Sequence, residues 1–131
     1  MKGPTGVKTI LVVDDDDSTV ELLAQLLELE GYTVLTASNG KEALESASRT
    51  VPGLIVTDQV MPIMTGAELF RALKSSPRLR QVPVILITSA PPAAARDLHW
   101  AELIRKPLDL EALLRSVHRV LREGCERSAL G

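Results

Sequence analysis

Short apolar runs alternate with longer amphipathic segments along most of the chain. The apolar runs have the length of β-strands and occupy residues 10–13, 33–37, 54–57, 84–87 and, more weakly, 103–104. The first, third and fourth runs are almost continuously apolar, as expected for parallel strands that helices cover on both faces. The pattern therefore predicts five strands, most of them buried.

The first segment between the runs has the period of an α-helix. Residues 18–30 carry a stripe of leucines that would face a core. Ser18 and Glu21 have the spacing of a capping box, and Gly31 is a typical helix stop. We expect a helix between these signals.

Three more helices are predicted further along the chain. Two short ones cover residues 41–49 and 67–74, each after a glycine. A longer one covers residues 108–123, with Asp109 as its N-cap and Gly124 as its end. Its inward-facing residues are expected to be Leu110, Leu113, Leu114, Val117, Val120 and Leu121.

Strands that alternate with helices predict a doubly wound α/β fold, a five-stranded parallel sheet with helices on both faces. Ligands of such sheets bind beyond the carboxyl ends of the strands. We expect one domain over residues 9–123, a flexible N-terminal lead-in over residues 1–8 and a C-terminal tail over residues 124–131.

Composition and charge narrow the class of protein. Aromatic residues make up only 2% of the 131 residues, which disfavours proteins that stack bases on aromatic side chains. The net charge of −2 provides no overall attraction for nucleic acid or an anionic membrane, and Arg71, Lys74, Arg78 and Arg80 are expected to form a solvated face.

The sequence also indicates the cellular location of the protein. No apolar run is long enough to span a bilayer, and the first residues lack the apolar stretch of a signal peptide. Cys125 has no partner for an intrachain disulfide, which fits a reducing compartment. We therefore expect a cytoplasmic protein that acts on neither nucleic acid nor membrane.

Polar residues follow four of the predicted strands where each strand ends. They are Asp14, Asp15, Asp16 and Asp17 after the first strand, Asp58 after the third, Thr88 and Ser89 after the fourth, and Lys106 after the fifth. Parallel strands end at one edge of a sheet, so these groups should meet there. For Asp16 and Asp17 we favour a role in capping the next helix.

Three carboxylates at one edge repel one another strongly and favour a bound cation. Asp14, Asp15 and Asp58 offer hard oxygen ligands, which select Mg²⁺ or Mn²⁺ over zinc. With a divalent cation and Lys106 the formal charge balances. Such a site suits transfer of a phosphoryl group, which depends mainly on positioning and charge neutralisation.

These residues resemble the motifs of the response-regulator receiver domains, the CheY-like family. The resemblance covers residues 9–122, and its motif residues are Val12-Val13-Asp14-Asp15, Asp58-Gln59-Val60-Met61-Pro62 with Gly66, Thr88-Ser89 and Lys106-Pro107. It implies the strand order 2-1-3-4-5. It also implies a two-component function, in which a phosphoryl group from a histidine kinase or a histidine phosphotransfer protein switches the binding of a downstream protein.

The resemblance also assigns roles to single residues. Asp58 would accept the phosphoryl group. Asp14, Asp15, Asp58 and the backbone carbonyl of Val60 would hold Mg²⁺. Thr88 and Lys106 would bind phosphoryl oxygens, and the Lys106-Pro107 bond would be cis. The domain would assist its own chemistry without being a turnover enzyme.

The segment before the fifth strand departs from the family pattern. Thr88 and Lys106 are 18 positions apart, which is shorter than usual in the family by about one helical turn. We expect a short or irregular fourth helix within residues 91–102, and output through a modified surface or through the first and last helices. Leu103 replaces a usual aromatic residue, and Trp100 is expected to serve in packing.

Two positions that tune reset in the family, two residues after the acceptor and two after Thr88, are Val60 and Ala90. Neither side chain can orient an attacking water. We expect slow loss of the phosphoryl group.

Two alternatives remain open. Asp15, Asp17 and Thr19 also match the nucleophile signature of the haloacid-dehalogenase-like phosphatases, although the chain is short for that class and Asp58 would have no role. The other is a receiver-like scaffold that binds its partner regardless of phosphorylation. Phosphatase activity that survives Asp58→Ala would favour the first, and failure to bind Mg²⁺ would favour the second.

Overall fold

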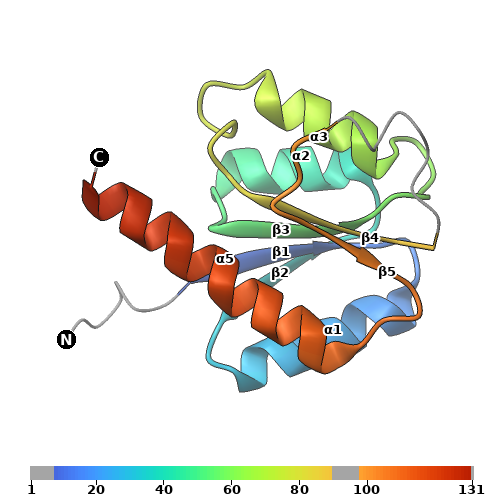
Figure 1. Cartoon of the computed structure of the whole chain (residues 1–131). Helices are drawn as coiled ribbons and strands as arrows, with labels where there is room; N and C mark the ends of the chain where they lie inside the picture. Colours follow the sequence, from blue (N-terminus) through green and yellow to red (C-terminus); the bar gives the residue numbers. More distant parts are fainter. Residues whose placement is uncertain (1–7, 90–97, 131) are drawn as a thin grey trace.

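The computed structural model describes the backbone of residues 8–89 and 98–130, and the side chains of these residues up to Glu123. Strands and helices alternate along the chain up to the fourth strand, after which the next described element is the fifth strand (Figure 1). Their bounds are β1 Thr9–Val13, α1 Asp17–Leu29, β2 Thr33–Ala37, α2 Gly40–Arg49, β3 Leu54–Asp58, α3 Gly66–Lys74, β4 Val84–Thr88, β5 Glu102–Arg105 and α5 Leu110–Leu130.

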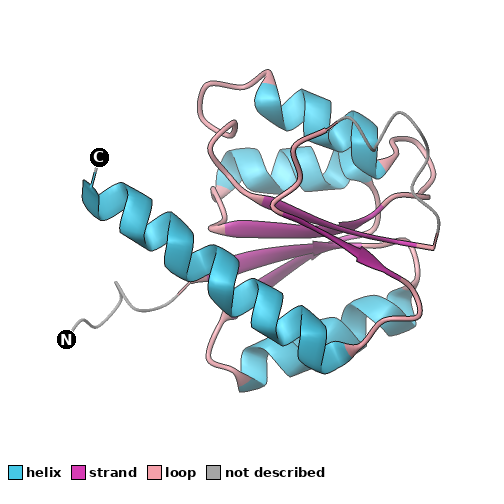
Figure 2. Ribbon diagram, in the orientation of Figure 1, coloured by secondary structure: helices cyan, strands magenta, loops and turns pink. Residues whose placement is uncertain are grey.

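The strands form one parallel sheet in the order β2-β1-β3-β4-β5. Helices α1 and α5 cover one face of this sheet, and α2 and α3 cover the other (Figure 2). The predicted doubly wound fold and the implied strand order are confirmed. Strand β2 lies on one side of β1 and β3 lies on the other, so the chain changes its direction across the sheet at β1.

The core lies on both faces of the three central strands, as the continuous apolar runs predicted. In β1, Leu11 and Val13 pack on the side of α2 and α3, whereas Ile10 and Val12 pack on the side of α1 and α5. All four side chains are buried. A strand that needs an apolar side chain at every position cannot show the alternating pattern of a half-exposed strand.

Strand register places the ends of the central strands at one level. Val13, the last residue of β1, pairs with Thr57 of β3, and Asp58 pairs with Ile87 of β4. The residues that follow β1, β3 and β4 therefore emerge side by side at the carboxyl edge of the sheet.

The start of α1 confirms the expected capping role of Asp16 and contradicts the predicted capping box. Its N-cap is Asp16, whose carboxylate accepts from the backbone N–H of Ser18 and from the hydroxyl of Thr19. The predicted capping box of Ser18 with Glu21 is wrong, because Asp16 supplies the acceptor two residues earlier. The stop at Gly31 is confirmed by its left-handed φ of 98°.

Helix α5 starts as predicted but ends later than predicted. Asp109 caps its start, accepting from the backbone N–H groups of Glu111 and Ala112. The helix then continues through Gly124 to Leu130, so the prediction that Gly124 ends it is wrong. A glycine inside a helix costs about 1 kcal/mol, which neighbouring turns of helix-forming residues can offset. In Figure 1 the last turns of α5 project beyond the sheet.

The region before β5 is described only in part. The predicted fourth helix falls largely on residues 90–97, which lie outside the described residues, as does Ala90. Trp100 packs against Phe70 of α3 with the ring centroids 4.6 Å apart, in agreement with its expected packing role. Leu103 of β5 packs near Ala67 and Leu86.

Among the described helices, none combines the length and apolar character needed to cross a membrane.

Two residues of the expected basic face make contacts with other parts of the structure. Arg78 donates to the carbonyl of Ser48, and Lys74 donates to the carbonyl of Arg80 while lying over the Phe70 ring. Two of its four side chains thus have structural contacts that join elements at the amino edge of the sheet.

Candidate functional site

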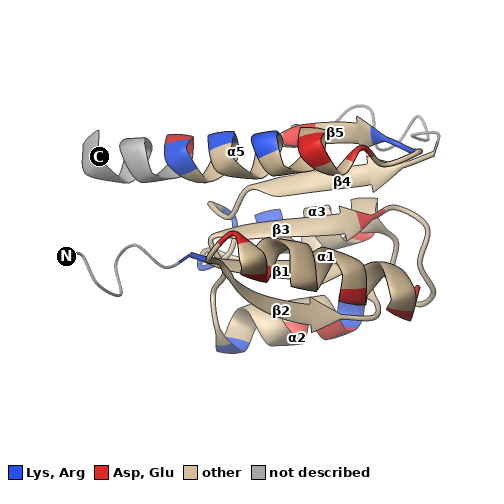
Figure 3. Cartoon of the chain, turned by 90° about the horizontal axis from the view of Figure 1, so that it is seen from below, with Lys and Arg blue, Asp and Glu red and all other residues tan. Residues whose placement is uncertain are grey.

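Three carboxylates meet at the carboxyl edge of the sheet. Asp14 and Asp15 follow β1, and Asp58 ends the neighbouring strand β3. One carboxylate oxygen from each residue lies within 4.8 Å of the other two. Asp14 and Asp58 are buried, with exposed fractions of 7% and 9%, whereas Asp15 is exposed to solvent. Figure 3 shows the acidic positions at the end of β3 and at the start of α1.

Backbone groups hold the two buried carboxylates in place. Asp14 Oδ1 accepts from the backbone N–H of Asp16 at 3.0 Å, and the Asp14 N–H donates to the carbonyl of Ala37 at the end of β2. Asp58 Oδ1 accepts from the N–H of Gln59 at 2.8 Å. These hydrogen bonds orient the carboxylates without neutralising them.

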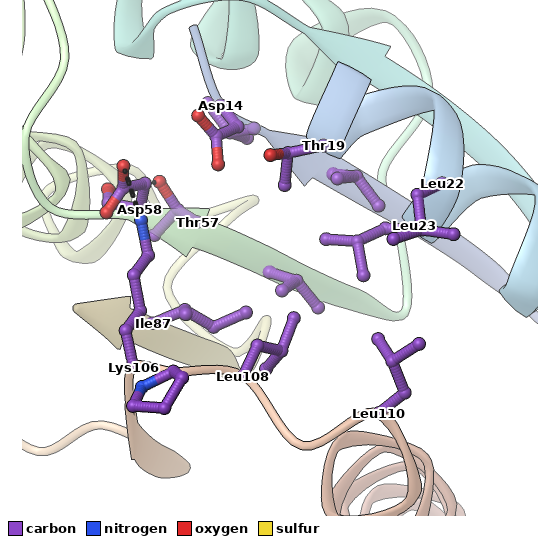
Figure 4. A pocket seen from close by; sticks show the side chains of 14 residues that line it. Asp14, Thr19, Leu22, Leu23, Thr57, Asp58, Ile87, Lys106, Leu108 and Leu110 are labelled. Atoms are coloured by element: carbon purple, nitrogen blue, oxygen red, sulfur yellow. Dashed lines mark hydrogen bonds and ion pairs between the residues drawn. The ribbon is translucent and has the colours of Figure 1, made fainter. Parts of the chain in front are cut away.

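Lys106 supplies the opposite charge. Its Nζ lies 3.5 Å from Asp58 Oδ2, and Figure 4 shows the side chain extending from the end of β5 to Asp58. The backbone N–H of Lys106 donates to the carbonyl of Thr88 at 2.9 Å, which ties the start of the β5–α5 loop to the end of β4. The Lys106-Pro107 peptide bond is cis, as predicted.

The charges do not balance within the site itself. Burial raises the pKa of Asp14 above its ordinary value of 3.8, and the negative charges of Asp58 and Asp15 raise it further, against the Asp16 N–H and Lys106. Three carboxylates and one ammonium leave a net charge of −2. A divalent cation would cancel it, and an all-oxygen ligand set fits Mg²⁺ or Mn²⁺.

The other predicted site residues lie around this cluster. Thr88 ends β4 beside Asp58 and is 2% exposed. Val60 lies on the loop after β3 with its side chain 75% exposed. The fold thus gathers Asp14, Asp15, Asp58, Thr88 and Lys106 at one edge of the sheet, and the role of the Val60 carbonyl remains a prediction.

Gln59 belongs to the framework of the site, although the sequence did not indicate a structural role for it. Its side-chain Oε1 accepts from the N–H of Ala67, and its carbonyl accepts from the N–H of Gly66. The chain after Asp58 is thereby closed onto the start of α3. The capping box of Thr65 and Glu68 before an apolar stripe is a sequence signal for the start of α3, but it does not indicate the contact with Gln59.

Comparison with known proteins shows the family of the chain. The family model of the response regulator receiver domain matches residues 10–118. The chain belongs to the response regulator receiver domain family. Its function is that of a two-component receiver, and the match favours neither the phosphatase nor the scaffold interpretation.

Individual relatives agree with the family match. The response regulator PleD of Caulobacter vibrioides is 39% identical over 132 residues, covering 93% of this chain but 29% of PleD. The regulatory protein PhoP of Bacillus subtilis, named for alkaline phosphatase synthesis, is 43% identical over 82 residues, which are 63% of this chain and 33% of PhoP. The receiver thus spans about a third or less of these two relatives.

Solved structures show the same fold. The signal receiver domain of a histidine kinase from Syntrophus aciditrophicus has a TM-score of 0.83 and 36% identity, covering 88% of this chain and 91% of that one. The chemotaxis response regulator CheY4 of Vibrio cholerae has a TM-score of 0.80 and 29% identity, and the match covers 87% of this chain and 98% of that one.

Removing the charge of Asp14 is expected to stabilise the metal-free receiver. Unit charges about 4 Å apart repel by about 1 kcal/mol even in water, and Asn keeps the acceptor for the Asp16 N–H. We expect Asp14→Asn to raise the free energy of unfolding at pH 7 by about 1 kcal/mol or more in a chelator, measured by urea denaturation.

The pH dependence gives the control. Because the pKa of Asp14 is raised on folding, its protonated form favours the folded state, and this contribution is lost as pH rises through the folded-state pKa. The gain from Asp14→Asn should therefore shrink as pH falls through the raised folded-state pKa, and it should be absent below the ordinary pKa of 3.8. A variant less stable than the wild type at pH 7 without metal would contradict the prediction.

Ile63, on the loop between β3 and α3, has a left-handed backbone. Its φ is 73°, which a β-branched residue adopts only with strain, and its side chain is 73% exposed. Ile63→Asn should raise the free energy of unfolding by about 1 kcal/mol, because Asn tolerates this conformation and little burial is lost. Thermal unfolding checks this, with the exposed Val51→Asn as a matched control expected to give no gain.

Proposed function

We propose that this receiver accepts a phosphoryl group on Asp58 while Asp14, Asp15, Asp58 and the Val60 carbonyl hold Mg²⁺, which Mn²⁺ can replace. The observation that supports this most directly is the arrangement of three carboxylates within 4.8 Å of one another, with Lys106 on one of them. When bound, the cation neutralises the carboxylates and withdraws charge from the phosphoryl oxygens.

The residues of the chain then carry out the transfer. The Gln59 N–H holds one oxygen of Asp58, and an Asp58 oxygen forms the new bond to phosphorus. The bond from phosphorus to the donor's imidazole nitrogen breaks, and that nitrogen keeps the electron pair. Lys106 balances charge on the transferred group, and the hydroxyl of Thr88 donates to one of its oxygens.

Transfer changes the balance of contacts around Thr88. The phosphoryl group adds charge and strong acceptors at the end of β3, which attract the Thr88 hydroxyl and the Lys106 ammonium. Lys106 and Thr88 are already joined through their backbones, so the ends of β4 and β5 respond together. A partner that binds the shifted state better supplies the output.

The donor in this proposal is a phosphohistidine of a sensor kinase or a phosphotransfer protein. The receiver acts as a cytoplasmic signalling module rather than a turnover enzyme. Membership of the receiver family supports a phosphohistidine donor and a signalling role in general terms. The downstream target is a protein, and the candidate surfaces for it are a modified output surface or α1 and α5.

A labelling experiment tests the proposal. We expect a small acyl phosphate to phosphorylate the protein in Mg²⁺, with the label mapped to the peptide that contains Asp58, and EDTA to stop the reaction. The metal dependence follows from the uncompensated charge of −2 at the site. Equal labelling with EDTA, or a label outside that peptide, would contradict the proposal.

A further inference from the structure

An apolar cavity opens beside the three carboxylates. Its volume is about 340 Å³, and it lies between α1, the central strands and the β5–α5 loop. Asp14, Asp58 and Lys106 line its polar end (Figure 4). Its remaining walls are mainly aliphatic, with Leu22, Leu23, Ile87, Leu108 and Leu110 among them.

The aromatic residues of the chain lie away from the cavity. Interiors are normally packed with few voids larger than a water molecule. The chain has one Phe, one Tyr and one Trp. Phe70 and Trp100 pack together on the α3 side of the sheet, and Tyr32 contacts His118. None of the three aromatic side chains lines this cavity.

The mouth of the cavity suits a small molecule. Val12 and Val56 of the sheet lie beneath it with exposed fractions of 0% and 1%, so its accessible walls are formed by the half-buried Leu108 and Leu110 and by Leu22. Leu22 of α1 lies on its wall and is 51% exposed, so the cavity reaches the surface. A pocket with an apolar body and a few polar groups at one end is typical of small-ligand sites.

The charge of the polar end selects the head group of the ligand. Asp14 and Asp58 line the cavity, Asp15 lies beside them, and Lys106 provides one positive charge. The net charge of −2 favours a cation and disfavours a carboxylate or a phosphate. Thr19 and Thr57 also line the cavity, but their hydroxyls donate to Asp16 and to the Asp58 carbonyl, so the carboxylates and Lys106 are the groups that set the charge at this end.

We propose that the cavity binds a small amphipathic amine, an alkyl- or arylalkyl-ammonium ion. The ammonium lies against Asp14 and Asp58, and the apolar tail lies among Leu22, Leu108 and Leu110. Binding excludes the divalent cation from the same carboxylates and therefore blocks phosphorylation, a consequence that rests on the proposed function. The amine is thus an inhibitory ligand of the metal-free receiver.

Hexylammonium is the probe for the test, added to the metal-free full chain and followed by titration calorimetry. We expect it to bind at least tenfold more tightly than methylammonium, which lacks the tail, and more tightly than hexanol or hexanoate, which lack the positive charge. Equal binding of methylammonium, or of hexanoate, would overturn the proposal.

Two leucines of α1 give a matched pair of variants. Leu22→Trp places an indole at the wall of the cavity. Leu29 lies about two helical turns further along α1; it is 84% exposed and does not line the cavity, so Leu29→Trp is the control. We expect Leu22→Trp to weaken hexylammonium binding at least tenfold and Leu29→Trp to leave it unchanged. Circular dichroism checks that both variants are folded. The opposite order, or equal effects, would contradict the site.

NMR of methyl-labelled wild-type protein provides a measurement that needs no variant. Hexylammonium should shift the methyl resonances of Leu22, Leu108 and Leu110, and not those of Leu29. Shifts confined to other methyl groups would overturn the proposal.

Added Mg²⁺ should then weaken hexylammonium binding in proportion to its own occupancy, and hexylammonium should slow labelling by an acyl phosphate. Binding that is unaffected by Mg²⁺ would overturn the exclusion of the metal. Calorimetric binding without any labelling under all conditions would contradict the proposed function instead, and leave the amine site standing.

Discussion

Replacing Asp58 with alanine is expected to abolish Mg²⁺-dependent labelling by a phosphodonor. Asp58 is buried at the end of β3, and Lys106 Nζ lies 3.5 Å from its Oδ2. Alanine removes both the nucleophilic oxygen and one of the three carboxylates at the metal site. We expect no detectable phosphoprotein by intact-mass spectrometry under conditions that label the wild type.

A second acidic residue provides the control. Asp17 is exposed in the first turn of α1 and is not among the three clustered carboxylates. Asp17→Ala should therefore be labelled like the wild type. Label that persists in Asp58→Ala and maps to Asp15 would contradict the proposed role of Asp58 and favour the phosphatase chemistry in which Asp15 is the nucleophile.

Adding a single methyl group at Gly66 is expected to damage both stability and labelling. A Cβ at this position would lie 2.5 Å from the backbone oxygen of Asp58 and 3.1 Å from both Gln59 Cα and Leu86 Cδ1. Two of these atoms belong to the backbone that carries the acceptor, so they cannot yield as the end of a flexible side chain would. We expect Gly66→Ala to lower the free energy of unfolding by about 2–3 kcal/mol, measured by urea denaturation.

The same substitution should slow labelling, because the displaced backbone carries Asp58. Gly53→Ala is the matched control. Its added Cβ would meet Leu121 Cδ2 at 3.4 Å and the Thr9 oxygen at 3.6 Å, which are ordinary contacts. Wild-type stability and labelling in Gly66→Ala, or a larger loss in Gly53→Ala, would show that the close approach of α3 to the end of β3 is unimportant.

Much of the site was predictable because its residues follow strands. The apolar runs located the ends of β1, β3, β4 and β5 to within one or two residues, and parallel strands end at one edge. Asp14, Asp58 and Lys106 were therefore expected at the same edge of the sheet, although their mutual distances depend on which strands are neighbours. The order β2-β1-β3-β4-β5 did not follow from the runs, and came from the family resemblance.

Helix ends were harder to predict because the local signals for starting and stopping a helix are weak or compete with one another. At the start of α1, four aspartates and Ser18 offered competing caps, and the conformation of the chain after β1 selected Asp16. At Gly124 the local signal predicted a stop, but the helix continues. Propensity differences of about 1 kcal/mol are too small to decide such cases alone.

The sequence by itself determined the strands, the edge at which they deliver polar groups, and the types of residue found there. Only the tertiary structure decided the left-handed backbone of Ile63, the closure of Gln59 onto α3 and the cavity beside Asp14. The physical reason is the range of the interactions. Periodic burial is written into neighbouring residues, whereas loop conformation and voids depend on contacts between segments that meet only after the sheet has formed.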